Sequence, residues 1–149
     1  MARVERTALL AFDAAQMLAL VQDVAHYPQF LPGCTSAVVE NSEGAFVRAR
    51  LGFRVKGLSD QFATENETSA QEDGSLFLKV RLLEGPFKRL DGEWRFLPLA
   101  ERACKISLVV ELDFGLRALE LLLGSQMERA VSGIIDAFKK RAEALYGKA

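Results

Sequence analysis

The sequence has 149 residues and a formal net charge of −1, from 19 basic and 20 acidic side chains. Half of the residues are hydrophobic, which excludes a disordered chain because burial of apolar surface can offset the entropy of ordering. The balanced charge excludes a generally basic nucleic-acid-binding protein, so we expect no DNA partner. The length suits one domain over residues 1–149, with a core that needs no disulfide or metal.

The N-terminal part predicts a strand and then a helix. Residues 2–12 are strand-like, and Asp13 to Gln16 read as a capping box before an apolar stripe at helical spacing over residues 14–25. Residues 26–34 hold two prolines and a glycine, so they have room for one short helix and a loop. Charged residues at positions 3, 5 and 6 argue against a secretion signal, and we expect a cytoplasmic protein.

Between residues 34 and 114 the apolar pattern changes to a period of two, which predicts antiparallel strands. In residues 46–56, one face carries Val47, Ala49, Leu51, Phe53 and Val55, and the other face carries Arg48, Arg50, Arg54 and Lys56. The same alternation returns in residues 104–114. Further strands are predicted at 34–40, 58–68, 76–83 and 90–97, and the short turns between them favour a meander.

The C-terminal part predicts a single long helix. Apolar residues recur every three or four positions from Leu119 to Leu145, and Gly147 stands where a helix ends. Gly124 and Gly133 inside it indicate a bend or a close neighbour. The whole is an α+β fold, in which a curved antiparallel sheet wraps around the C-terminal helix, with one or two short helices after the first strand. Space between sheet and helix suits an apolar ligand, unless the same side chains fill it as core.

Three motifs carry a resemblance to a known family. They are HYPQFLPGC at 26–34, LEGPFKRLDGEWRFLP at 83–98 followed by Cys104, and AFKKRAEALYG at 137–147. Together they resemble the coenzyme Q-binding protein and ribosome association toxin family of the START-like, polyketide cyclase-like, helix-grip superfamily, over nearly the whole chain. Gly33 stands where that family usually has Trp, so closure of the cavity mouth is looser here or comes from Phe30 and Leu31.

The resemblance implies a hydrophobic cavity for a polyprenyl quinone, ubiquinone before others, or a similar lipid. It implies a lipid carrier or chaperone that supports respiration, has no enzyme activity and no cofactor beyond the bound lipid, and transiently touches the inner face of the membrane. The alternative that it implies is a toxin that binds the large ribosomal subunit and blocks subunit association. Burial of a polyprenyl tail is favourable by about 25 cal/mol per Å2, which supports the lipid more directly.

The candidate ligand-binding residues come from the loop after the first helix, the inward faces of the strands and the C-terminal helix. They are Tyr27, Phe30, Leu31, Pro32, Phe53, Val55, Phe62, Leu78, Phe87, Trp94, Phe96, Leu108, Val110, Met127 and Ile134. Tyr27 and residues 30–32 form either a gate that touches a membrane or a packed corner. Trp94 beside Gly92 either shapes a pocket or packs in the core, and Phe87 beside a Gly-Pro turn could cover an entrance.

The basic row Arg48, Arg50, Arg54 and Lys56 suits an anionic partner such as RNA or lipid head groups. Glu65 and Glu67 on the neighbouring strand could neutralise it through cross-strand pairs. An ordinary solvated sheet face is the alternative interpretation.

The sequence carries no motif of a catalytic or metal site. His26 is the only histidine, so a metal site with several histidine ligands is impossible. Cys34 lies near it in sequence, but no nucleophile signature supports a Cys–His pair, and Cys34 and Cys104 read as reduced thiols. We expect no catalytic residue and no metal.

Overall fold

The computed structural model describes residues 2–55 and 57–147, apart from the side chains of residues 2, 58, 119, 122, 123 and 127. Of the predicted site residues, Lys56 and the side chain of Met127 therefore lie outside the described residues. The strands are β1 (Ala2–Leu10), β2 (Cys34–Glu43), β3 (Phe46–Val55), β4 (Leu58–Ala70), β5 (Leu76–Glu84), β6 (Arg89–Ala100) and β7 (Ala103–Asp113). The helices are α1 (Ala14–Gln22), the 3-10 helix η1 (Val24–Gln29), α2 (Arg117–Ser132) and α3 (Ile134–Tyr146).

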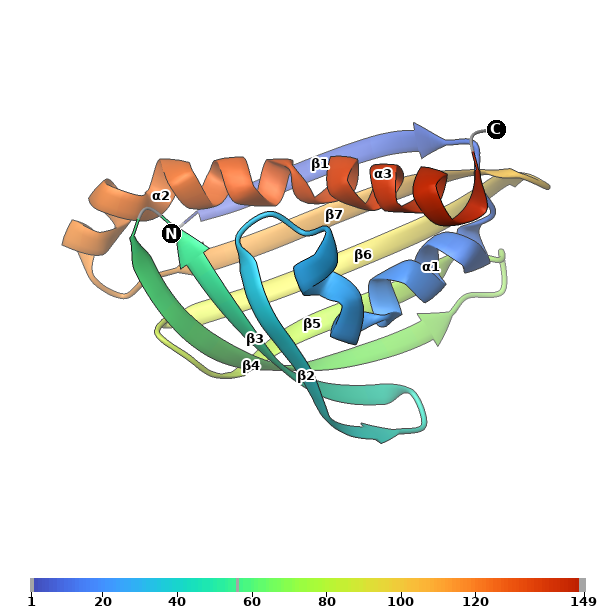
Figure 1. The fold of residues 1–149 in the computed structure, drawn as a ribbon. Helices are drawn as coiled ribbons and strands as arrows, with labels where there is room; N and C mark the ends of the chain where they lie inside the picture. The colour runs from blue at the N-terminus through green and yellow to red at the C-terminus, as the bar shows by residue number, and fades with distance from the viewer. Residues whose placement is uncertain (1, 56, 148–149) are drawn as a thin grey trace.

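All seven strands form one antiparallel sheet in the order β1-β7-β6-β5-β4-β3-β2. Strands β2 to β7 follow one another as a meander, and β1 closes the far edge by pairing with β7, with Leu10 opposite Cys104. The sheet curves around the terminal helices, which lie across its concave side, and α1 with η1 covers one end (Figure 1). The predicted α+β helix-grip fold is confirmed.

Alternation along the strands decides which side chains enter the core. In β7 the even-numbered residues from Cys104 to Leu112 are all buried, and Phe114 just beyond the strand is buried as well. In β3, Ala49 and Phe53 are buried whereas Arg48 and Arg54 are exposed. The period of two in the sequence therefore gave the correct inward face of both strands.

Helix α1 begins with the predicted capping box. The Asp13 carboxylate accepts a hydrogen bond from the backbone N–H of Ala15 at 3.2 Å, and the Asp13 N–H donates to the Gln16 side chain at 3.4 Å. Its buried residues are Ala14, Met17, Leu20 and Val21, which face the sheet. Through these residues α1 covers one end of the concave side of the sheet.

The single C-terminal helix of the prediction is wrong in one respect. The structure divides it at Gly133, whose ψ of −9° departs from the helical value. The Gly133 N–H still donates to the Arg129 carbonyl and its own carbonyl still accepts from the Ala137 N–H, each at 3.0 Å. The two helices therefore stay end to end (Figure 1). Among the described residues, none lies within 4 Å of where a Cβ of Gly124 would be.

Candidate functional site

An apolar cavity of about 210 Å3 lies between the concave face of the sheet and the junction of α2 with α3. All the elements except β1 and β2 reach it. Its lining consists of Val21, Val24, Tyr27, Leu31, Pro32, Ala49, Leu51, Phe62, Thr64, Asn66, Leu78, Val80, Phe87, Leu90, Gly92, Trp94, Leu108, Val110, Ala130, Val131, Ile134 and Phe138. Apolar cavities of roughly 150 Å3 stay dry and admit benzene, so this one has room for a ring-sized apolar group.

Ten of the predicted ligand-binding residues line this cavity. They are Tyr27, Leu31, Pro32, Phe62, Leu78, Phe87, Trp94, Leu108, Val110 and Ile134. Phe30, Phe53, Val55 and Phe96 do not line it. Their side chains pack against other core residues.

The loop after η1 is partly packed and partly at the rim. Tyr27 is buried, and its hydroxyl donates to the Val21 carbonyl. Phe30 packs edge-on against Phe138 at 5.1 Å between ring centroids, and the Arg141 guanidinium lies 5.1 Å from the Phe30 ring centroid. Leu31 and the exposed Pro32 line the cavity. Tyr27 and Phe30 therefore form the packed corner, and Leu31 and Pro32 form a rim.

Gly33 follows this rim with a φ of +83°, in the left-handed region that favours glycine. Its backbone carbonyl accepts a hydrogen bond from the Arg54 N–H at 2.9 Å, which ties the rim to β3. A Trp at this position would have a strained backbone. Of the two residues expected to replace the family Trp at the mouth, Leu31 lines the cavity and Phe30 does not.

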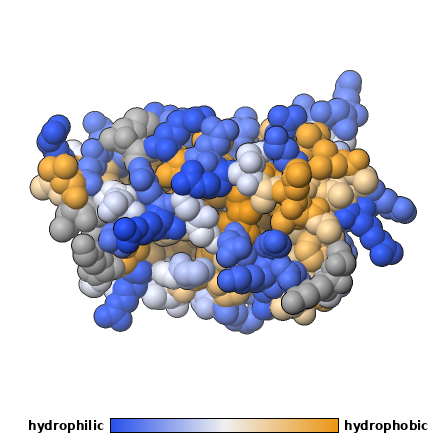
Figure 2. Space-filling model, turned by 90° about the horizontal axis from the view of Figure 1, so that it is seen from above, coloured by the Kyte–Doolittle hydropathy of each residue, from blue (hydrophilic) through white to orange (hydrophobic). Residues whose placement is uncertain are grey.

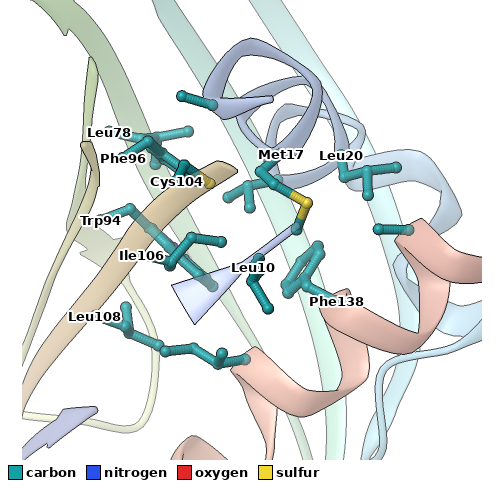
Figure 3. Packing of buried hydrophobic residues seen from close by; sticks show 14 of the residues in the cluster. Leu10, Met17, Leu20, Leu78, Trp94, Phe96, Cys104, Ile106, Leu108 and Phe138 are labelled. Atoms are coloured by element: carbon teal, nitrogen blue, oxygen red, sulfur yellow. The ribbon is translucent and has the colours of Figure 1, made fainter. Parts of the chain in front are cut away.

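On β6, two neighbouring inward side chains have different surroundings. Trp94 and Phe96 stack with centroids 5.9 Å apart and an interplanar angle of 8°. Both are buried, but only Trp94 lines the cavity. Gly92, which has no side chain to fill the space, lines it as well. Phe96 lies toward α1, in the solid cluster with Met17 and Cys104 (Figure 3). Phe96 is thus core, and Trp94 is both core and cavity wall.

A second cluster of aromatic residues closes the cavity at the β5–β6 turn. The Phe87 ring centroid lies 5.6–5.7 Å from those of Phe53, Phe62 and Phe114. The centroids of Phe53 and Phe62 are 5.8 Å apart. Phe62 and Phe87 line the cavity, whereas Phe53 and Val55 support them from behind. Phe87 is therefore a buried wall residue.

Two polar residues in the lining were missed at the sequence level. Thr64 and Asn66 of β4 are 1% and 9% exposed, and the Thr64 hydroxyl donates to the Asn66 side-chain oxygen at 3.0 Å. The signal was present in the sequence, because Phe62 shares the inward face with both of them by alternation. Val21, Val24 and Phe138 were also missed, since helical spacing alone does not tell which core residues border a void.

The basic row lies on the outer face of the sheet, among acidic side chains. Arg50 is paired with Glu40 at 3.2 Å and with Glu84, and the hydrogen bonds that its guanidinium donates to Glu84 and Glu40 raise its pKa. Arg48 shares a groove with Glu43 and Glu65. The register places Arg48 opposite Glu65 as expected, but Glu65 is paired with Arg81 at 2.5 Å. Within the described residues, Arg48 and Arg54 have no ion pair of their own.

The remaining reactive side chains are apart from the cavity. His26 is exposed, with Nδ1 2.7 Å from the Asp23 carboxylate, and the Cys34 thiol donates to the Ser36 carbonyl at 3.4 Å. Burial raises the pKa of both thiols, that of Cys104 to about 11. Among the described residues no group of three or more His, Cys, Asp or Glu is placed to hold a metal ion. No helix in this part of the chain combines the length and apolar character that crossing a membrane requires.

A curved antiparallel sheet that grips terminal helices around an apolar cavity defines the START-like, helix-grip class. A family model described as "Polyketide cyclase / dehydrase and lipid transport" matches residues 10–139. The chain belongs to this family.

Similar proteins extend over the same length. The chain is 41% identical to the ribosome association toxin RatA of Vibrio cholerae, over 99% of this chain and all of the relative. It is 34% identical to the 18 kDa protein CC1736 of Caulobacter crescentus, whose solution structure superposes with a TM-score of 0.75 over 99% of each chain. The Zhui aromatase/cyclase of a Streptomyces species shares the fold at a TM-score of 0.83 and 18% identity over 99% of each chain.

Proposed function

We propose that the protein binds a polyprenyl quinone, ubiquinone before others, and carries it without changing it chemically. The cavity is the observation that supports this most. At about 210 Å3 it suits the ring of a quinone and is too small for a long tail as well, because pockets for larger ligands run to roughly 300–1,000 Å3. The tail therefore leaves the cavity over the rim.

The rim offers a path for such a tail. Pro32 and Ala130 line the cavity and are exposed, and they belong to the loop after η1 and to α2. Seen from above, the molecule carries patches of hydrophobic side chains between hydrophilic ones (Figure 2). We infer that the protein works in the cytoplasm and meets the inner membrane surface at this rim, where a lipid tail passes from one apolar environment to another.

The lining favours binding over catalysis. Of the described lining residues, only Tyr27 is ionisable. Burial, with smaller effects from Cys34 and Asp23, raises its pKa, and its hydroxyl is engaged by the Val21 carbonyl. General acid–base catalysis needs a group whose pKa is near the working pH, and such a group is missing from these side chains. We therefore assign no reaction to the cavity.

The test uses Trp94, the only tryptophan of the chain, as reporter. A quinone ring in the cavity lies against the indole and should quench its fluorescence. We expect titration with decylubiquinone, a ubiquinone with a saturated ten-carbon tail, to quench saturably, and lipid extracted from the purified protein to contain polyprenyl quinone by mass spectrometry. A protein that is free of lipid and shows no saturable quenching of Trp94 would contradict the proposal.

A second candidate function is association with the ribosome through its large subunit, blocking subunit association. Its support is the 41% identity to a ribosome association toxin over 99% of the chain. Arg48 and Arg54 are the cations of the basic row with no ion pair among the described residues, so they are the ones left to meet phosphates. The other charged residues that line the groove at Arg48 are acidic, Glu43 and Glu65.

Co-sedimentation with large subunits tests this candidate. Binding by the wild type that is lost in Arg48→Glu/Arg54→Glu and kept in Lys105→Glu, an exposed cation of β7, would support it. Equal sedimentation of all three proteins would remove the row from the mechanism, and no sedimentation of the wild type would reject the candidate.

A further inference from the structure

The concave face contains one polar interruption. Thr64 and Asn66 are successive inward residues of β4, and the residues opposite them on both sides are apolar: Ala49 and Leu82 for Thr64, Val47 and Val80 for Asn66. Both side chains line the cavity. Two polar groups at this depth need a reason, because burying a polar group without a partner costs about 1–3 kcal/mol.

The two side chains satisfy each other only in part. The Thr64 hydroxyl donates to the Asn66 Oδ1 at 3.0 Å, and in this arrangement the Nδ2 group is left as a donor of two hydrogens. Among the described residues no acceptor is bonded to Asn66 Nδ2. Asn66 as a residue is 9% exposed and lines the cavity, so this amide group belongs to a largely buried side chain at the cavity wall.

We propose that the Asn66 amide donates a hydrogen bond to a carbonyl oxygen of the bound ligand, with Thr64 holding the amide in the orientation that presents its N–H2 group. This rests on the proposed function and deepens it, since it selects the ligand class. The ligand is an apolar molecule with a carbonyl on its ring-sized head group. A pure hydrocarbon of equal size binds more weakly than this ligand. Asn66 is a specificity residue, and Thr64 is a positioning residue.

A single hydrogen-bond donor is enough for this selection, which explains why Thr64 and Asn66 both belong to one strand, β4. Trp94, Leu78, Leu108 and Val110 give the rest of the ring site apolar walls, which exclude water from the amide. A neutral hydrogen bond in such surroundings discriminates by leaving the amide unpaired when the ligand lacks an acceptor. Orientation of the head group is then fixed by one donor, and affinity comes from apolar contact.

The test compares two ligands that share a tail. Decylubiquinone has the carbonyl groups, and decylbenzene has a ring and tail without oxygen. Quenching of Trp94 gives the dissociation constant of the quinone, and recovery of fluorescence as decylbenzene displaces the quinone gives the second constant. We expect the wild type to prefer the quinone.

Three variants separate the donor from its surroundings. Asn66→Leu, of similar volume, should weaken quinone binding about tenfold, which corresponds to about 1.4 kcal/mol, and leave decylbenzene binding unchanged or tighter. Thr64→Val should weaken quinone binding by a smaller factor, about threefold, because the amide loses its fixed orientation. Thr68→Val is the matched control: the same strand and face, but its hydroxyl donates to the Ala45 carbonyl at 3.4 Å and it does not line the cavity.

The outcomes are distinguishable. Far-ultraviolet circular dichroism of each variant shows whether it is folded, and Asn66→Leu should have a lower free energy of unfolding than the wild type because it leaves the buried Thr64 hydroxyl without its acceptor. If both ligands bind the wild type and Asn66→Leu changes neither affinity, or changes both equally, the amide does not select a carbonyl and this inference is wrong while the proposed function stands. If neither ligand binds the wild type, the proposed function fails and the inference fails with it.

Discussion

Two regions of the same concave face are packed differently. Under α1 the face is solid: Phe96, Ile106 and Met17 are each at 1% exposure or less, and none of the three lines the cavity (Figure 3). One inward position further along β6 and β7, Trp94 and Leu108 border an open cavity. The two regions have the same strands, the same alternation and equally apolar residues.

The difference comes from what covers each region and from a few small residues. The solid region is filled from above by the side chains of α1. The cavity region is covered by the α2–α3 junction, and Ala49, Gly92 and Ala130 occupy lining positions where larger side chains would fill the space. A Cβ at Gly92 would lie 3.4 Å from the Val80 Cβ, so this glycine sets the width of the cavity. Small residues opposite the helix junction therefore leave a cavity where larger side chains would complete the core.

Truncating the two stacked aromatic residues should separate the regions most strongly. Phe96→Ala leaves a new void in the solid region and should lower the free energy of unfolding by about 4 kcal/mol. Trp94→Ala should cost less, because one side of the indole already faces a cavity and makes fewer contacts there. Urea denaturation measures both, and a larger loss for Trp94→Ala would refute the contrast between the regions.

Enlarging matched residues of β7 tests the same contrast from the opposite direction. Ile106→Phe overpacks the solid region and should destabilise by about 1–3 kcal/mol, whereas Leu108→Phe extends into the cavity and should cost under about 1 kcal/mol. Leu108→Phe should also abolish saturable quenching of Trp94 by decylubiquinone, and Ile106→Phe should preserve it. Equal costs together with retained binding in both variants would mean that the cavity is not the ligand site.

Stability in alkaline solution tests how dry the solid region is. The Cys104 thiol has its pKa raised by burial from 9.0 to about 11, with a smaller effect of Asp13. Above pH 9 the unfolded chain loses this proton while the folded chain keeps it, so stability falls as pH rises from about 9 to 11, by up to about 1.4 kcal/mol per pH unit.

Chemical denaturation at a series of pH values measures this slope. Cys104→Val should make it shallower without removing it, because burial also raises the pKa of Tyr27. An unchanged slope in Cys104→Val would show that the thiol is hydrated in the folded protein.

Narrowing the cavity at its glycine should give the smallest effect on stability. Gly92→Ala places a methyl group against Val80 and removes some freedom from the unfolded chain, so we expect a change in the free energy of unfolding within about 1 kcal/mol. Affinity for decylubiquinone should fall several-fold because the ring has less room. Gly124→Ala on α2, where no described residue lies within 4 Å of the added Cβ, is the control and should leave affinity unchanged.

Much of the fold was readable from the sequence because its determinants are local. The Asp13 capping box and the alternation of β3 and β7 fixed element type and inward face. The break at Gly133 was indicated only as one of two options, because glycine inside a helix is compatible with either a bend or a close neighbour.

The site was less predictable, because a void is a property of packing between distant segments. Trp94 and Phe96 have the same pattern in the sequence, and only the position of α1 decides which of them borders the cavity. Thr64 and Asn66 were passed over because polar residues on a strand usually face solvent. Alternation with Phe62 places both on the inward face, but a single sequence does not show that this part of the face borders a cavity.

The central claim is that the cavity between the sheet and the α2–α3 junction is the place where an apolar ligand binds. Methyl-resolved nuclear magnetic resonance during titration with decylubiquinone tests it most directly. The methyl signals of Leu78, Leu108 and Val110 should shift on binding, while those of Leu10 and Ile106 in the solid region stay in place. Shifts confined to Leu10 and Ile106, or no shift in any of the five, would contradict the account.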